Sequence, residues 1–416
     1  MENLIEELKK LEELIIRCMK CGACQSVCPL YQKDLVEQSV ARSKLALIES
    51  IYQGKIEEAE RVLKYLDYCI LCSRCKANCP SGVKFDEIIL KAKSILRRIK
   101  KLPFWQKTLL KLVMEKQELL SNITPMVHIA FKYGANNVKD DIFRVLIKKY
   151  SNRHFISLKN TPFFITHKGL NKAKNEKMKV IFYPGCAVNF IITSIGEAIL
   201  NLLTSNEISV YIPETNKCCG IPAATLGDLD LFMKLVNYHY DFFASLDAAY
   251  VITCCPTCEY ALKDLGPRII MRNASVEVLD ILVFIDQILG LNLKRKLKGN
   301  VSLHMPCHYN TSYSTIPKSF IDKHFESTFL NLDNQECCGF GGTFNIKFYR
   351  DSKEISMSKV DEIKSKDIGI LFTPCPGCIM QLKDATTTAG LDTIVCHPIE
   401  KLYQNQTNPL KGEYNG

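Results

Sequence analysis

The chain has 416 residues, 47% of them hydrophobic, which is enough for two or three folded domains with ordinary apolar cores. It carries 20 cysteines and a formal net charge of +10. The apolar run that comes nearest to a membrane span, residues 276–291, contains Asp280 and Asp286. Composition therefore predicts a soluble globular protein and excludes a membrane-spanning one, while the charge is compatible with acidic partners or membrane surfaces.

Two cysteine runs organise the first 80 residues. Each follows the spacing C-x2-C-x2-C-x3-C-P, which places three thiolates on one [4Fe-4S] cluster and lends the fourth to the other cluster. Zinc sites favour more widely separated C-x2-C pairs, so zinc fits poorly. The expected ligands are Cys18, Cys21, Cys24 and Cys79 (the first N-terminal set) and Cys69, Cys72, Cys75 and Cys28 (the second N-terminal set).

Disulfides are the weakest interpretation of these cysteines. The chain begins Met-Glu-Asn-Leu-Ile-Glu-Glu, which lacks the basic and apolar regions of an export signal. We therefore expect a cytoplasmic location and metal ligation.

Helical periodicity surrounds the two runs. We expect helices at 2–16, 41–52 and 55–67, the last two separated at Gly54. Residues 1–100 are therefore expected to form an all-α two-cluster ferredoxin domain.

Residues 101–176 are expected to form a basic helical connector. From Lys91 to Lys111 the chain has eight Lys or Arg residues and no acidic one, with Trp105 beside an apolar stripe. A helix of this kind can lie on an anionic membrane surface, although packing of the stripe on the protein itself is more common in soluble folds. No nucleic-acid-reading motif accompanies the charge, so nucleic acid is not an expected partner.

From about residue 179 the chain repeats itself. Cys186, the Cys-Cys-Gly at 218–220 and the C-x2-C at 255–258 recur as Cys307, 337–339 and 375–378 (307 minus 186 is 121, 338 minus 219 is 119, 375 minus 255 is 120). Strands are expected at 179–184, 208–212, 249–253, 301–305 and 368–373, and helices at 195–203 and 231–246. We expect a duplicated pair of α/β domains, 177–295 and 296–416, with sites outside the carboxyl ends of their strands.

Each half brings five cysteines to corresponding strand ends. Five thiolates exceed a tetrahedral zinc site or one cubane cluster, and Gly220 and Gly339 permit the positive φ that turns both adjacent sulfurs inward. A non-cubane iron-sulfur cluster fits this count; a cubane with a spare thiol, a zinc site and a redox dithiol are the alternatives. The expected ligands are Cys186, Cys218, Cys219, Cys255 and Cys258 (the first Cys-Cys-Gly set) and Cys307, Cys337, Cys338, Cys375 and Cys378 (the second Cys-Cys-Gly set).

Other residues near these sets are less specific. Cys254 and Cys396 have no counterpart in the other half and are expected to be buried free thiols. His304, His308 and His397 can donate to a cluster sulfur or supply a proton, although a packed structural histidine is the more common case. The run 339–343 lacks the Lys-Ser/Thr ending of a phosphate loop, so we expect it to pack closely around the cluster loop.

Together these motifs resemble the iron-sulfur subunit family of glycolate oxidase. The resemblance rests on the tandem runs followed by two Cys-Cys-Gly domains, on Gly185-Cys186-Ala, on Gly342-Thr343 after the second Cys-Cys-Gly, and on His397-Pro-Ile-Glu400. Related families are the iron-sulfur subunits of lactate and glycerol-3-phosphate dehydrogenases and the catalytic subunit of heterodisulfide reductase. The resemblance implies a subunit that passes electrons from the flavin of an FAD-binding partner, which oxidises a 2-hydroxy acid such as glycolate or lactate, to a quinone or other acceptor.

A flavin in a partner agrees with the lack of a Gly-x-Gly-x-x-Gly motif in this chain. No residue is assigned a catalytic role, because substrate oxidation is expected in the partner. One departure from the pattern of many glycolate oxidase subunits favours an alternative function. Both C-x2-C pairs are complete in this chain, which is similar to heterodisulfide reductase, where a Cys-Cys-Gly cluster itself cleaves a disulfide. With the electron-transfer function we also expect the chain to contact the inner face of the cell membrane peripherally. A zinc-stabilised scaffold would leave the N-terminal runs without a role.

Overall fold

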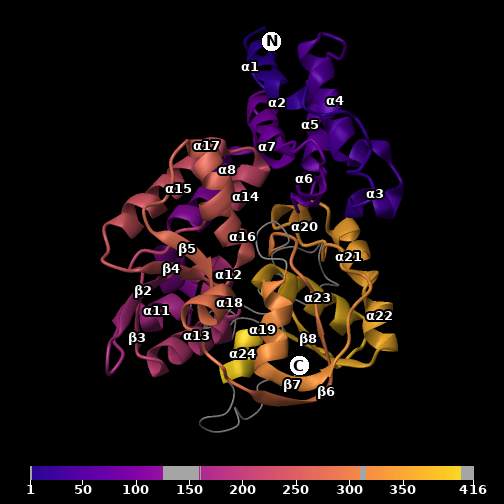
Figure 1. Cartoon of the computed structure of the whole chain (residues 1–416). Helices are drawn as coiled ribbons and strands as arrows, with labels where there is room; N and C mark the ends of the chain where they lie inside the picture. The colour runs from indigo at the N-terminus through magenta and orange to yellow at the C-terminus, as the bar shows by residue number, and fades with distance from the viewer. Residues whose placement is uncertain (1, 125–158, 160, 310–314, 404–416) are drawn as a thin grey trace, which may run out of the picture.

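The computed structural model describes residues 2–124, 159, 161–309 and 315–403. The N-terminal helices form one end of the molecule, above two lobes that are each built on a β-sheet (Figure 1). In the N-terminal region, α7 (Phe85–Leu96) packs against α14 (Ile221–Leu226) and α15 (Leu229–Ala244) of the first lobe, and α3 (Pro29–Asp34) packs against α21 (Tyr349–Met357) of the second. The cysteine runs are therefore held where both lobes meet.

The described residues up to 100 form helices and no strand. The helix expected at 2–16 is divided at Lys10 and Leu11, the one at 41–52 is present, and the one at 55–67 begins only at Ala59. The buried face of this last helix consists of Val62, Leu63 and Leu66 and packs toward α7. The remaining elements are α1 (Glu2–Lys9), α2 (Glu12–Ile15), the 3-10 helix η1 (Glu37–Ser39), α4 (Ala41–Tyr52), α5 (Ala59–Asp67) and α6 (Arg74–Ala77).

The basic segment between Lys91 and Lys111 is not one helix. After α7 ends, the chain turns and α8 (Phe104–Glu115) starts again behind Pro103, which has an extended ψ of 138°. Proline has no N–H and disfavours helical backbone in the residue before it, so a helix cannot continue through Pro103, but a new one can begin after it. Residues 125–158 and 160 of the expected connector lie outside the described residues.

Both lobes contain a sheet with the same central strand order. The first sheet is ordered β1-β3-β2-β4-β5, with β1 antiparallel to β3 and the other pairs parallel, and the second is ordered β7-β6-β8-β9 and wholly parallel. Val180 pairs with Val210 in the first sheet, and Leu303 pairs with Phe372 in the second. The order β3-β2-β4-β5 is that of β7-β6-β8-β9, so the period in the cysteine pattern reflects duplication of a whole lobe.

Strand β2 shows how the first sheet is buried. Val180 and Phe182 pack on one face, in a core shared with α13 and the second lobe, while Ile181 and Tyr183 pack on the other face with α7 and α15. Successive side chains of a strand point to opposite faces, and parallel sheets are usually covered on both. The core of the N-terminal helices is therefore continuous with that of the first lobe.

The strand and helix expectations for the two halves are confirmed to within a few residues, except that β6 begins well before residue 301. No helix among the described residues is long and apolar enough to cross a bilayer. The first lobe also contains α11 (Phe163–His167), β1 (Gly169–Asn171), β2 (Met178–Phe182), α12 (Gly185–Phe190), α13 (Thr193–Ser205), β3 (Ile208–Ile212), β4 (Tyr250–Thr253), α16 (Pro256–Glu259), the π-helix η3 (Tyr260–Leu265), α17 (Gly266–Ile270), β5 (Glu277–Asp280), α18 (Ile281–Val283) and the π-helix η4 (Phe284–Ile288). The second also contains β6 (Arg295–Leu303), α19 (Ile316–His324), β7 (Phe325–Phe329), α20 (Thr343–Lys347), α22 (Val360–Ser365), β8 (Ile368–Phe372), α23 (Pro376–Thr388), β9 (Ile394–Cys396) and α24 (Pro398–Tyr403).

Candidate metal centres

The two N-terminal runs share an unusual backbone. Lys20 and Gly22 in the first run, and Leu71 and Ser73 in the second, all have positive φ, at 57°, 88°, 57° and 57°. These residues lie between successive cysteines of each run. A left-handed residue reverses the chain locally, and for a non-glycine residue it costs roughly 1–2 kcal/mol. The same costly turns in both runs indicate a constraint that points three thiols toward one centre.

Cysteines of one N-terminal run lie close to cysteines of the other. The Cys28 thiol interacts electrostatically with Cys72 and Cys69 of the other run, and burial raises its pKa to about 11. Cys24 interacts with Cys18 of its own run and also with Cys75. The structure thus brings the N-terminal sets side by side, and their assignment to individual clusters remains a prediction.

In each Cys-Cys-Gly loop the glycine is required for two reasons. Gly220 and Gly339 have φ of 89° and 85°, the left-handed region that favours glycine. A Cβ at Gly339 would lie 2.6 Å from the carbonyl oxygen of Ser352, and one at Gly220 would lie 2.8 Å from the Phe232 ring. Backbone conformation and close approach therefore both depend on glycine.

The C-x2-C cysteines lie at the N-termini of helices. Cys255 caps α16 and Cys375 caps α23, in each case with proline as the first helical residue and the partner cysteine in the first turn. Proline is well suited to this position because its missing N–H has no helical partner there. The helix start thus fixes the positions of both cysteines of each pair.

The five thiols of the first Cys-Cys-Gly set form a connected group. Side-chain hydrogen bonds link Cys186 to Cys218, Cys218 to Cys219, Cys219 to Cys258 and Cys258 to Cys255. Bonds from Cys218 and Cys258 lower the pKa of Cys219 to about 6. The second cysteine of the Cys-Cys-Gly is therefore the preferred thiolate.

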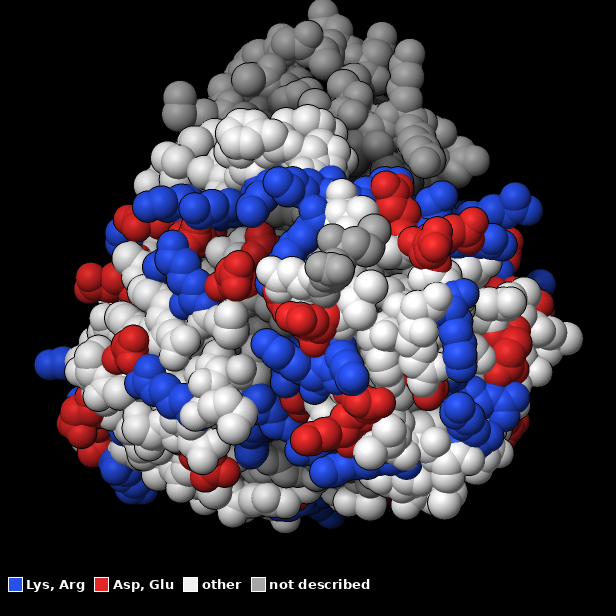
Figure 2. Space-filling view, turned by 90° about the horizontal axis from the view of Figure 1, so that it is seen from above, with Lys and Arg blue, Asp and Glu red and all other residues white. Residues whose placement is uncertain are grey.

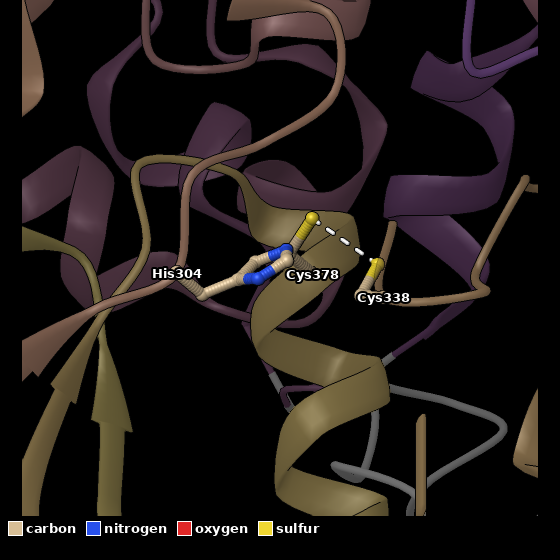
Figure 3. A group of neighbouring side chains, drawn as sticks. All are labelled: His304, Cys338 and Cys378. Atoms are coloured by element: carbon tan, nitrogen blue, oxygen red, sulfur yellow. Dashed lines mark hydrogen bonds between the residues drawn. The ribbon is translucent and has the colours of Figure 1, made fainter. Parts of the chain in front are cut away.

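The second Cys-Cys-Gly set repeats this arrangement. Cys307 bonds to Cys337 and Cys337 to Cys338, while the sulfurs of Cys338 and Cys378 lie 3.2 Å apart (Figure 3). Cys375 bonds to Cys378. Bonds from Cys337 and Cys378 hold the pKa of Cys338 well below its usual range. Bonds from Cys255 and Cys378 likewise hold the pKa of Cys375 well below its usual range. Both halves thus present five soft donors, with Cys219 the preferred thiolate of the first set and Cys338 and Cys375 those of the second, and such a donor set fits iron-sulfur ligation.

Two further contacts join the sets. Cys255 and Cys375 hydrogen-bond each other, which connects the two Cys-Cys-Gly sets, and Cys72 bonds to Cys337, which connects the second N-terminal set to the second Cys-Cys-Gly set. A Cβ on Gly341 would lie 2.9 Å from the Ile70 side chain, so this glycine lets the loop approach the N-terminal run. The close packing expected for residues 339–343 is therefore present.

The three histidines differ in their surroundings. His304 is fully buried, neither ring nitrogen has a hydrogen-bond partner, and a ring nitrogen and the Cys338 and Cys378 sulfurs all lie within 4.8 Å of one another (Figure 3). His308 contacts Thr257 Oγ1 and the Leu71 carbonyl oxygen, each at 3.0 Å, so it ties all three parts of the molecule together. The third, His397, begins the turn into α24, and its backbone N–H donates to Glu400.

Three residues near the sets escaped the sequence analysis. Tyr183 lies 121 positions before His304 and His239 lies 120 before Lys359, so the internal period could have found them. The Tyr183 hydroxyl donates to the Lys217 carbonyl at 2.7 Å, and the His239 ring donates to the Cys218 carbonyl at 3.0 Å. Buried Lys359 donates to Asn334, and it interacts electrostatically with Cys338 and Cys337.

The residues at corresponding positions, His239 near the first Cys-Cys-Gly set and Lys359 near the second, differ in charge. Burial lowers the pKa of His239 to about 4, so this side chain is neutral at pH 7. Burial also lowers the pKa of Lys359, to about 8, which leaves it mostly cationic at pH 7. Cys254 and Cys396 are buried, as expected.

Comparison with known proteins agrees with this organisation. The profile described as a 4Fe-4S dicluster domain matches residues 15–83, and that of the cysteine-rich domain CCG matches residues 180–263 and 301–383. A probable glycolate oxidase iron-sulfur subunit of Bacillus subtilis is 25% identical, over 94% of each chain. Lactate utilization protein A of Bacillus cytotoxicus is 27% identical, over 54% of this chain and 98% of that protein. A fumarate reductase (CoM/CoB) subunit of Methanothermobacter marburgensis is 27% identical, over 53% of this chain and 45% of that one.

These matches and the converging thiols identify iron-sulfur clusters as the cofactors, among them the two [4Fe-4S] clusters of a dicluster domain.

Proposed function

Because the chain belongs to the iron-sulfur protein family that joins a 4Fe-4S dicluster domain to two cysteine-rich CCG domains, the family of the glycolate oxidase iron-sulfur subunit, we propose that it is the electron-transfer subunit of an FAD-linked 2-hydroxy-acid oxidase or dehydrogenase. A separate FAD-binding subunit would oxidise glycolate, lactate or a similar acid, and a quinone or other acceptor would receive the electrons. Similarity to the glycolate oxidase subunit and to lactate utilization protein A supports this substrate class.

The observation that carries the proposal is the unbroken series of interactions between ligand sets. Cys24 interacts with Cys75, Cys72 with Cys337, and Cys375 with Cys255. The series therefore runs from the first N-terminal set to the second N-terminal set. It continues to the second Cys-Cys-Gly set and ends at the first Cys-Cys-Gly set. When bound, the clusters supply one-electron transfer. The chain holds their ligands close together and mostly away from water.

The donor is proposed to dock beside the first N-terminal set. Cys21 is exposed there, and the neighbouring apolar residues Ile16 and Met19 are 69% and 68% exposed. Isolated apolar side chains on a surface are ordinary, but here two of them flank an exposed ligand.

A reconstituted complex tests the function. The chain, purified anaerobically with an FAD-linked oxidase, is expected to couple glycolate or lactate oxidation to reduction of a quinone analogue. Cys72→Ser should abolish this coupling, because Cys72 connects the N-terminal sets to the rest. Cys254→Ser changes a buried thiol outside the expected sets and serves as the matched control. Equal loss in both variants, or full coupling without this chain, would contradict the proposal.

A second candidate function is reduction of a disulfide at a Cys-Cys-Gly cluster. The observation in its favour is that all ten cysteines of the Cys-Cys-Gly sets are present and that the two sets touch through Cys255 and Cys375. Such a reaction consumes two electrons and two protons and releases two thiols from one disulfide. The isolated chain, supplied with a reduced viologen and a low-molecular-weight disulfide, would then release thiols catalytically. Turnover in that assay would replace the first function with this one.

We also propose that the protein lies at the inner face of the cell membrane, with α8 as the contact. Trp105, Leu109 and Val113, at positions i, i+4 and i+8, are 64%, 51% and 39% exposed, whereas Met114 is buried against the first lobe. Exposed lysines flank the stripe at 101, 107, 111 and 116. In the view from above, a row of basic side chains borders an uncharged protrusion of the surface (Figure 2). Apolar side chains with flanking lysines are typical of helices that lie on anionic membranes.

Co-sedimentation with vesicles tests this contact. The full chain should bind vesicles that contain anionic lipid, less so at high salt, and should not bind neutral ones. Trp105→Ser combined with Leu109→Ser should weaken binding without removing core contacts, and Leu170→Ser, at an exposed site in β1, is the control. Binding that is insensitive to salt and to the double substitution would exclude the contact.

A further inference from the structure

We propose that His304 donates a ring N–H to a sulfur of the cluster held by the second Cys-Cys-Gly set, and thereby makes that cluster easier to reduce than its counterpart in the first half. The inference rests on the proposed function, since it concerns the same centres, and it adds a positioning residue that is not a cysteine.

The place of His304 in the fold fixes its direction. It follows the last residue of β6, and its backbone N–H donates to the Phe372 carbonyl of β8 at 2.8 Å, so the sheet holds its backbone. The side chain is fully buried, and Cys338 and Cys378 are its neighbours (Figure 3). These cysteines come from the Cys-Cys-Gly loop and from α23, so three separate segments converge on one point.

The ring has a hydrogen bond to give and no protein atom to receive it. A neutral imidazole carries one N–H, and leaving a buried donor unpaired is destabilising. Neither ring nitrogen of His304 has a partner, whereas every other histidine in the part of the chain that the structure describes has at least one partnered ring nitrogen. A sulfur of the cluster that the second Cys-Cys-Gly set would hold, or a cysteine sulfur bound to it, would be the missing acceptor.

Donation to sulfur fits better than ligation of iron. Five thiols already converge on this set, which leaves no shortage of ligands. Outer hydrogen bonds to ligands and sulfurs are a common means of tuning a metal centre, and they stabilise the reduced, more negative cluster.

The first half lacks this donor. Tyr183 occupies the corresponding position and interacts electrostatically with four cysteines of the first set. Its hydroxyl hydrogen is already donated to the Lys217 carbonyl. Two equivalent positions therefore differ in whether a donor is free to face the cluster.

The test compares redox potentials in the full chain loaded with iron and sulfide. In a titration followed by EPR, His304→Phe should shift the midpoint potential of the second Cys-Cys-Gly cluster to more negative values, and His304→Gln, which keeps an N–H donor, should restore part of the shift. Tyr183→Phe is the matched control in the first half and should leave the potential of the first cluster unchanged. Iron content should be the same in all variants.

A spectroscopic measurement on the wild type does not depend on the variants folding. Pulsed EPR of protein labelled with ¹⁵N-histidine should show a weak nitrogen coupling to the second Cys-Cys-Gly cluster. A strong coupling, as for nitrogen bound to iron, or no coupling at all would overturn the inference, as would unchanged potentials in His304→Phe with full iron content. Absence of any cluster in the wild-type Cys-Cys-Gly sets would instead contradict the proposed function.

Discussion

The two Cys-Cys-Gly halves have the same strand order and corresponding ligands, yet different surroundings. Neutral Tyr183 and His239 accompany the first set, whereas His304 and cationic Lys359 accompany the second. Arg74 of the N-terminal region adds positive charge near Lys359 and His304. A buried cation favours the reduced form of a nearby cluster. Duplication therefore preserved the geometry of the ligands, while substitutions behind them made the two centres electrostatically unequal.

The halves also differ in their contact with the N-terminal region. Cys337 of the second Cys-Cys-Gly set bonds to Cys72, whereas Cys255 of the first Cys-Cys-Gly set bonds to Cys375 of the second. The second half, which holds buried Lys359, is thus the one that receives electrons first in the proposed series.

Removing one cysteine ligand, from either half in turn, should have the largest effect on cluster content. The two variants should also differ in how they affect electron transfer. Cys219→Ser and Cys338→Ser are each expected to lose one cluster, about four irons if the cluster is of [4Fe-4S] composition. Only Cys338→Ser should also stop reduction of the opposite Cys-Cys-Gly cluster, because the second set lies between the N-terminal sets and the first. Freeze-quench EPR after addition of reductant measures this. Normal reduction of the first set in Cys338→Ser would refute the order of the series.

Next in size is the loss of the buried carboxylates that fasten the N-terminal region to each half. Asp67 pairs with Lys93 at 3.2 Å and Arg97 at 2.8 Å, and with Lys347 of the second half. Asp86 pairs with Arg268 of the first half at 2.7 Å. Asp67→Asn should cost about 3–5 kcal/mol, because Lys93 is left buried without a carboxylate.

Asp86→Asn should cost less, since Asp264 and Glu87 still pair with Arg268. Chemical denaturation under anaerobic conditions compares the two variants. Burial alone would raise the pKa of Asp67, but Lys93, Lys347 and Arg97 bring it below its ordinary value. Its contribution is therefore present above the unfolded pKa of about 3.9 and disappears as the pH falls through the lower folded value. The Asp67→Asn variant should lose less stability below pH 4 than wild type, and parallel acid curves would argue against this role.

Replacing the glycines of the two Cys-Cys-Gly loops should give a smaller difference in stability between the halves. Alanine at either position adopts a left-handed backbone and crowds a neighbour, for a cost of about 2–4 kcal/mol. Gly339→Ala should be the more harmful, because its Cβ meets a backbone carbonyl, whereas at Gly220 it meets a ring that can move. Thermal unfolding midpoints of the two variants give the comparison, and an equal or reversed order would contradict it.

Neutralising Lys359 should have the smallest effect. Lys359→Met is expected to make reduction of the second Cys-Cys-Gly cluster less favourable by about 1–2 kcal/mol, the order of a charge–charge interaction at an effective dielectric constant of about 20. Lys359→Arg keeps the charge and should restore most of the potential. His239→Gln in the first half changes no charge at pH 7 and should shift nothing. A redox titration that finds equal shifts in Lys359→Met and His239→Gln would show that charge is not the cause.

Several features of the candidate centres could be predicted from sequence because they are local. The spacing of the cysteine runs, the proline at the start of α16 and α23, and the glycines of the Cys-Cys-Gly loops depend on backbone geometry over a few residues. The hydrophobic period likewise located β3 and α4. The break at Pro103 was also local and was missed, since the charge pattern continued across it.

The amino-acid sequence by itself determined the ligand types, their local spacing and the duplication, because short-range backbone preferences and periodicity encode them. Tertiary structure alone decided that Cys72 meets Cys337, that Cys255 meets Cys375, and that His304 rather than His308 has an unpaired ring. These contacts join residues far apart in the chain, and they depend on how two lobes and a group of helices pack together. No local pattern carries that information. The internal period could have paired Tyr183 with His304 and His239 with Lys359, but only the folded molecule shows that these side chains lie beside the cysteines.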